Sequence, residues 1–169
     1  MRLGTYGSVN GWVGKDNGFE YGTGVSLASY KNKLNWQTSI THSKPTWRED
    51  LFLVRTVGSE TYNQVTKEPY NPNNLTFSGN VDYYLSDKHI IGFGGRWNKR
   101  TSDRIASSKT IISDTNNSNV LFSENTFDRD RKDFNINPYY EYRSDTDKLV
   151  IDFNYIDYKN NSMNTLSDV

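Results

Sequence analysis

The chain has 169 residues, with 20 Lys and Arg against 20 Asp and Glu and no cysteine. This balance leaves no positive surplus for a polyanion, which argues against nucleic acid as a partner, and the lack of cysteine excludes disulfides and thiolate metal sites. Hydrophobic residues make up only 34% of the sequence, but aromatic residues reach 14%. A thin core is therefore expected, in a chain too aromatic to be disordered.

Apolar and polar residues alternate with a period of two along most of the sequence, which predicts β-strands and almost no helix. For example, Leu34, Trp36 and Ile40 share one face of a strand, while Asn35 and Gln37 share the other. Taken in chain order, the predicted strands lie near 4–13, 19–30, 33–42, 75–85, 89–98, 133–143 and 148–158.

Two kinds of connection separate these strands. Short polar turns at 31–33, 86–88 and 144–147 predict hairpins whose turns all lie on one rim of an antiparallel meander. Between the hairpins lie two long polar segments, Ser43 to Asn74 and Lys99 to Lys132, which we interpret as loops on the opposite rim. Loops of that length count against a compact soluble domain.

Strands of about ten residues with short turns on one rim and long loops on the other are typical of a transmembrane β-barrel. A soluble sandwich would instead cover its apolar faces with a second sheet and carry short loops at both ends. The expected fold is all-β, an antiparallel meander of hairpins forming a partial transmembrane-type β-barrel of about seven strands, with residues 1–169 as a single segment. The expected lipid-facing side chains are Trp36, Ile40, Phe77, Val81, Ile91, Phe93, Ile136, Ile151 and Phe153.

The stretches "GNVDYYLSDKHIIGFGGRWNKR" and "INPYYEYRSDTDKLVIDFNYIDY" resemble the β-barrel region of TonB-dependent-receptor-like outer membrane proteins of Bacteroidetes, in which hairpins of the form Y-x-L-x-D-K-H-x-x-G recur. The resemblance runs from Gly4 to about Tyr158. Such receptors have an N-terminal plug and about 22 strands, so this chain is expected to be an internal barrel segment without a plug. The resemblance implies a place in the bacterial outer membrane and uptake of a nutrient such as an iron chelate or a glycan.

The same resemblance implies no catalysed reaction and no cofactor. The partners that it implies are membrane lipid, a TonB-type energising protein and the small-molecule or glycan ligand. The polar strand faces would line a hydrated lumen, although such residues can equally form an ordinary solvated sheet face. The candidate lumen and substrate-lining residues are Asn35, Gln37, Asp82, Arg96, Glu141, Arg143 and Asp152.

One segment expected in a loop carries side chains typical of recognition sites. In "KPTWREDLFLVRT", Trp47, Arg48 and Arg55 could stack on a sugar or hold a carboxylate. The alternative, which we prefer, is that "LFLVRTV" extends a strand above the membrane and that Trp47 belongs to the aromatic belt at the membrane interface.

The other motifs do not indicate a metal, phosphate or calcium site. His42 and His89 lie on different hairpins near opposite strand ends, which argues against a shared metal site. The glycines of "GTGVS" and "GFGGRW" are not followed by a helix, so they are expected to leave room for aromatic rings rather than to hold phosphate. "DTNNSN" at 114–119 departs from a calcium loop at its sixth and twelfth positions. No catalytic or metal-binding residue is therefore predicted.

Two other classes remain open. A soluble β-sandwich or β-meander module that binds glycans would show the same alternation, and a barrel enzyme would need a Ser–His or Asp–His set at one rim. If the chain is a barrel segment, its apolar face and free edges would stay uncovered in water. The isolated chain would then form a homo-oligomer or collapse into two layers.

Overall fold

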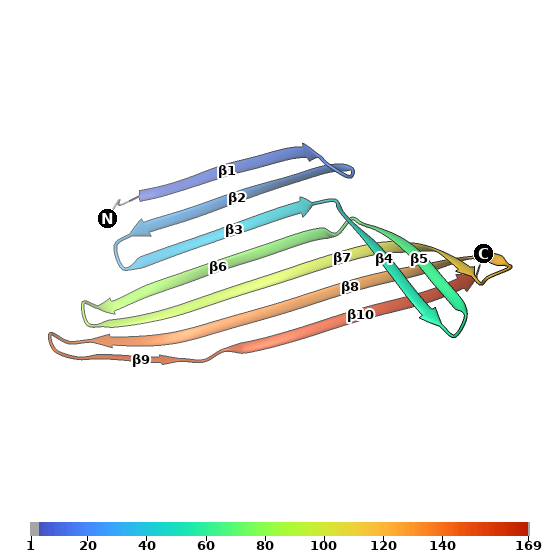
Figure 1. The fold of residues 1–169 in the computed structure, drawn as a ribbon. Coiled ribbons are helices and arrows are strands. Elements are labelled where there is room, and N and C mark those ends of the chain that lie inside the picture. Colours follow the sequence, from blue (N-terminus) through green and yellow to red (C-terminus); the bar gives the residue numbers. More distant parts are fainter. Residues whose placement is uncertain (1–3, 169) are drawn as a thin grey trace.

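The computed structural model describes residues 4–168, all of whose regular elements are strands of one antiparallel sheet. The sheet curls into a half-barrel (Figure 1), which confirms the predicted all-β fold. No helix among residues 4–168 is long and apolar enough to cross a membrane. The strands are β1 (Gly4–Lys15), β2 (Phe19–Lys31), β3 (Leu34–Lys44), β4 (Trp47–Val57), β5 (Glu60–Tyr70), β6 (Asn73–Ser86), β7 (His89–Ser113), β8 (Ser118–Arg143), β9 (Lys148–Asp152) and β10 (Tyr155–Asp168).

The ten strands form a meander of seven longer ones. The pairing of β4 with β5 continues the register of β3 with β6 without a shift, so β3 and β4 form one interrupted strand and β5 and β6 form the next. In the same way, β9 and β10 pair with β8 in a single register. Each long strand pairs with its neighbours in sequence, as the short hairpin turns predicted.

The three short turns lie on one rim, at the left of Figure 1, as predicted. At the first, Asn32 has a φ of 53°, a left-handed conformation that asparagine tolerates better than most residues. At the opposite rim, the β7–β8 turn is held by Asp114, whose carboxylate accepts hydrogen bonds of 2.7 Å from the amides of Asn116 and Asn117. These bonds favour the charged form and lower the pKa of Asp114.

The prediction of two long loops was wrong. Residues 43–74 contain the β4–β5 hairpin, and residues 99–132 contain the outer halves of β7 and β8, which run for 25 and 26 residues. Both faces of these extensions carry many polar side chains, so the alternation that marks a half-buried strand is weak there. The alternative that "LFLVRTV" extends a strand is confirmed, because these residues lie in β4.

Two prolines explain why the long hairpin is interrupted. Pro45 and Pro72 occupy the unpaired gap between the two ladders and stand opposite each other if the common register is continued across it. Proline has no N–H to donate to a ladder, so the strands separate there. Pro72 is fully buried, and the β4–β5 hairpin bends away from β3 and β6 at this point (Figure 1).

The sheet has an apolar face and a polar face. We call the face that carries Trp36 and Ile40 the outer face, and the face that carries Asn35 and Gln37 the inner face. Side chains crowd together on the concave side of a curved sheet, and the inner face is the crowded one. Most buried side chains of the sheet lie on this face: Ala28, Asn35, Ile90, Ser102, Ala106 and Glu141, while Ser29 is buried on the outer face.

The outer face lies open. Phe77 is 51% exposed, Phe93 49% and Phe153 62%. The two long segments extend the same sheet and form no second layer over these rings, so the two-layered collapse expected in water is not observed. The homo-oligomer expected as its alternative stays a prediction.

Candidate functional site

The inner face brings together all seven residues predicted to line a lumen. Strand pairing places Asn35, Asp82 and Asp152 in one row across the sheet, with Gly92 and Tyr139 between the last two. Gln37, Arg96, Glu141 and Arg143 lie on the same face because side chains alternate strictly along each strand. Whether they contact a substrate stays a prediction.

Glycines on this face make room for aromatic rings, as predicted. Tyr139 of β8 lies across Gly92 of β7 and donates a hydrogen bond of 2.6 Å to Asp82 of β6. A Cβ at residue 92 would overlap the Tyr139 ring. Trp12 covers Gly22 in the same manner on β1 and β2. A glycine on one strand thus leaves space for a large ring from the neighbouring strand to lie across it.

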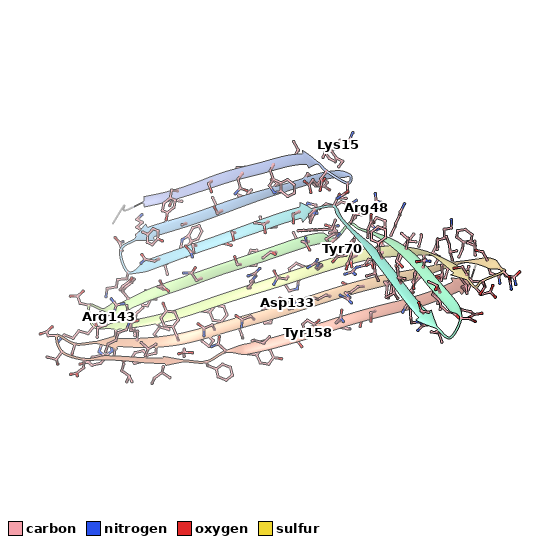
Figure 2. All side chains as sticks on the ribbon, viewed as in Figure 1. Lys15, Arg48, Tyr70, Asp133, Arg143 and Tyr158 are labelled. Atoms are coloured by element: carbon pink, nitrogen blue, oxygen red, sulfur yellow. The ribbon has the colours of Figure 1, made fainter. Side chains whose placement is uncertain are left out.

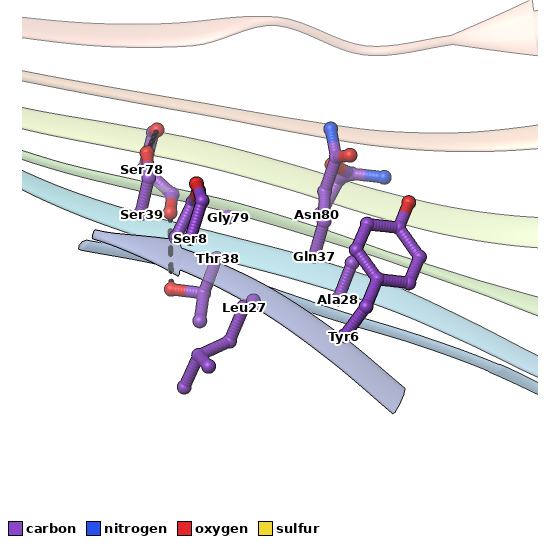
Figure 3. A pocket seen from close by; sticks show the side chains of 12 residues that line it. Tyr6, Ser8, Leu27, Ala28, Gln37, Thr38, Ser39, Ser78, Gly79 and Asn80 are labelled. Atoms are coloured by element: carbon purple, nitrogen blue, oxygen red, sulfur yellow. Dashed lines mark hydrogen bonds between the residues drawn. The ribbon is translucent and has the colours of Figure 1, made fainter. Parts of the chain in front are cut away.

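A hollow of about 510 Å³ lies over β1, β2, β3 and β6 (Figure 3). Serines from these four strands form a row, in which the hydroxyls of Ser8 and Ser26 are 2.7 Å apart and those of Ser39 and Ser78 are 2.8 Å apart. In Figure 3 the side chains of Ser8, Ser39 and Ser78 point to the opposite side of the sheet from Leu27. A row of four serine hydroxyl groups therefore crosses the inner face at this hollow.

A second cavity, of about 440 Å³, lies at the base of the β4–β5 hairpin, near Arg48 and Tyr70 in Figure 2. Arg100 donates a hydrogen bond of 2.6 Å to the Tyr70 hydroxyl, and the guanidinium of Arg104 lies 4.1 Å from the centre of the Tyr70 ring. Trp47, which pairs with Tyr70 across the strands, is 60% exposed. We call this cavity the mouth.

The polar and charged side chains at the mouth change the pKa of Tyr70. Burial favours the neutral phenol, but a hydrogen bond with Ser102 and the positive charge of Arg100 outweigh it, so the pKa of Tyr70 is lowered. Arg104 is bound to Glu68, with 2.6 Å between the guanidinium and the carboxylate. The mouth thus combines exposed aromatic surface with a guanidinium, Arg100, that is bound only to a neutral hydroxyl among residues 4–167.

Five arginines gather around and below the mouth on the inner face. Among residues 4–167, only two of them have an acidic partner: Arg104 binds Glu68, and Arg131 lies 3.4 Å from Asp133. Arg100 and Arg131 face each other directly across β7 and β8, an arrangement of like charges that destabilises a sheet. A bound anion would relieve it. These inner-face arginines are Arg96, Arg100, Arg104, Arg129 and Arg131.

The three predicted loop residues lie in strand β4 and do not form one cluster. Trp47 and Arg48 both line the mouth. Trp47 lies on the inner face, not on the outer face that a residue of the membrane-interface belt would occupy. Arg55 lies nearer the tip of the hairpin, with its guanidinium 5.2 Å from the centre of the Tyr62 ring.

Sequence reasoning missed Tyr70 and the arginines at 100 and 104. The spacing of Arg96, Arg100 and Arg104 is even, so a strand through all three puts them on one face. That signal could have identified the arginine row if residues 99–132 had been interpreted as strand. The pairing of Tyr70 with Trp47 could not have been found without the register of β4 and β5.

The remaining candidates stay apart. His42 binds Asn73 beside the Pro45 bend, and His89 binds Tyr140 at the rim with the short turns. Within the part of the chain that the structure describes, no group of three or more His, Asp or Glu side chains could hold a metal ion. No protein-family model matches this sequence, and no curated protein matches it either.

Proposed function

We propose that the chain is part of an outer membrane β-barrel that takes up a polar nutrient. The observation that carries this proposal is the open outer face, whose apolar side chains face no protein among residues 4–168. At about 25 cal/mol per Å², even a few hundred Å² of such surface corresponds to several kcal/mol in water. Contact with lipid would remove the free-energy cost of exposing this surface to water.

The dimensions of the outer face agree with a bilayer. The apolar band runs from Tyr142 to Phe134 on β8 and is bounded by Trp97 on β7. Eight residue steps correspond to about 27 Å along the strand at about 3.4 Å per step. With a strand tilt of about 40°, the height is about 20 Å, close to the roughly 25 Å of known barrels.

The inner face supports a role in receiving a ligand. It carries a row of serine hydroxyls in the hollow, and its mouth is lined by three arginines against two glutamates, with Trp47 and Tyr70 as rings for stacking. Guanidinium groups bind carboxylates and phosphates through paired hydrogen bonds. The ligand that suits this surface is a small polar molecule with negative charge, a description that fits an iron chelate or an acidic glycan.

Tryptophan fluorescence in bilayers of brominated lipid tests the membrane proposal. The variant W12F/W47F keeps Trp36 and Trp97 on the outer face, and its matched control W36F/W97F keeps Trp12 and Trp47 on the inner face. We expect brominated acyl chains to quench the outer pair and soluble acrylamide to quench the inner pair. Equal quenching of both pairs by the lipid, or none, would contradict the proposal.

The rival function is a soluble glycan-binding module with the aromatic residues as its platform. The exposed outer rings are the observation in its favour. It requires the chain to stay monomeric in detergent-free buffer and its Trp36 and Trp97 fluorescence to respond to a neutral oligosaccharide. Neither response is expected of a barrel segment.

A further inference from the structure

Three lysines form a row on the outer face. Lys99 of β7 stands opposite Lys132 of β8, and Lys132 stands opposite Lys159 of β10. Neighbouring strands are about 4.8 Å apart, so the three side chains start within about 10 Å of one another. We call these three residues the lysine row.

Nothing in the described chain neutralises the row fully. Lys132 lies 3.4 Å from Asp130, and both side chains are more than a third exposed. Asp157 is the other carboxylate on a neighbouring row of this face. Among residues 4–167, Lys99 and Lys159 form no ion pair. Like charges directly opposite each other destabilise a sheet. An anion bound from outside the chain would reduce this repulsion.

The position of the row indicates which anion. It lies two residues beyond Trp97 and Phe134, at the edge of the apolar band and on the same face. Lysines at such an edge can lay their methylene chains along apolar surface and keep the ammonium group in the polar layer. Resting on the membrane placement proposed above, we propose that the lysine row binds the phosphate groups of anionic lipid headgroups.

Native mass spectrometry of the whole chain in detergent micelles tests this inference. Micelles would contain either phosphatidylglycerol or phosphatidylcholine with the same acyl chains, and retained lipid would be counted. The test variant is K99Q/K132Q/K159Q. The matched control is K15Q/K67Q/K109Q, which removes the same charge from lysines of the outer face that stand apart from the row.

We expect the unmodified chain and the control to retain phosphatidylglycerol in preference to phosphatidylcholine, and the test variant to lose that preference. A basic residue near an anionic membrane surface contributes about 1 kcal/mol, so each lysine should account for about a fivefold difference in affinity. Single substitutions should therefore give graded losses. Inorganic phosphate at matched ionic strength should displace the lipid no better than chloride.

Two results would overturn the inference. One is equal retention of phosphatidylglycerol by the test variant and the control while the outer tryptophans are still quenched by brominated lipid, which would leave the proposed function standing. The other is specific displacement by inorganic phosphate, which would assign the row to a free anion. Failure of both the lipid quenching and all lipid retention would instead remove the proposed function itself.

Discussion

Gly92 shows how a single missing side chain organises the inner face. The Tyr139 ring occupies the space above it and reaches Asp82 on the next strand. Gly92→Ala would force that ring away and break its hydrogen bond. We expect a loss of about 1–3 kcal/mol in the free energy of unfolding, typical of overpacking, measured by urea denaturation in detergent.

Gly94→Ala is the control for this substitution. It lies on the same strand and face, but a Cβ at residue 94 would meet its nearest neighbour, the Asn137 carbonyl, at 3.8 Å. This variant should stay within about 0.5 kcal/mol of the parent or gain stability, because alanine loses less backbone entropy than glycine. If the two substitutions changed the free energy of unfolding equally, the position of the Tyr139 ring would not depend on the missing side chain at Gly92.

Arg100 is the residue at which the mouth can be tested. Arg100→Gln keeps a hydrogen-bond donor near the Tyr70 hydroxyl but removes the charge. Hydrogen bonds to charged groups contribute about 1.5–3 kcal/mol, so binding of a uronic acid oligosaccharide should weaken by a factor of ten or more in titration calorimetry. Arg48→Gln should have a smaller effect, because Arg48 is already paired with Asp50 at 2.9 Å. A neutral oligosaccharide that binds equally well would contradict the requirement for an anion.

The sequence predicted the composition of the inner face well and that of the mouth poorly, for one physical reason. Once a strand is recognised, alternation alone assigns each side chain to a face, so Asn35, Asp82 and Glu141 could be placed without a structure. Contacts between strands depend on register. Trp47 meets Tyr70 only because β4 and β5 pair as they do, and no local pattern encodes that pairing.

At the scale of elements, Pro138 explains why one long strand is interrupted between β9 and β10. Phe153 donates to the Pro138 carbonyl at 3.0 Å, but Pro138 has no N–H to return. The Asn137 side chain donates instead to the Phe153 carbonyl at 3.1 Å. A side-chain amide thus replaces the missing ladder bond and keeps the register.

A double mutant can test whether the Asn137 amide replaces the hydrogen bond that Pro138 cannot donate. Asn137→Ala should cost about 1 kcal/mol, the usual net value of a hydrogen bond, in the free energy of unfolding. In a Pro138→Ala background, where the backbone N–H is restored, Asn137→Ala should cost much less. Additive effects of the two substitutions would show that the Asn137 amide does not stand in for the ladder bond.

The element boundaries show where alternation stops being informative. The prediction for the strand at 75–85 and for the start of the strand at 89–98 is close, because one face of each is apolar. The outer half of β7 continues the same strand to Ser113 with polar groups on much of both faces, and its hydrogen bonds to β5 and β8 hold it extended. Pairing, and not hydrophobicity, defines these outer halves.

At the scale of the whole molecule, the open outer face predicts how the chain behaves in water. Sedimentation velocity should show self-association in detergent-free buffer and monomers in detergent. The variant F77S/F93S/I151S should associate less, because it removes apolar surface from the outer face. V150S/I156S/Y158S changes exposed side chains of the inner face and should associate as the parent does. A parent chain that is monomeric without detergent would contradict the lipid-facing assignment.

The length of β7 gives the proposed barrel an unusual profile. From Trp97, at the edge of the apolar band, to Ser113 is sixteen more residue steps, or about 54 Å along the strand at about 3.4 Å per step. The hairpin tips would stand far above the headgroups, while the mouth would lie only a few steps above them. A ligand would have to pass between these long strands before reaching the arginines of the mouth. Selection would thus begin with size and shape, since a thin chain could enter and a bulky particle would be stopped at the tips.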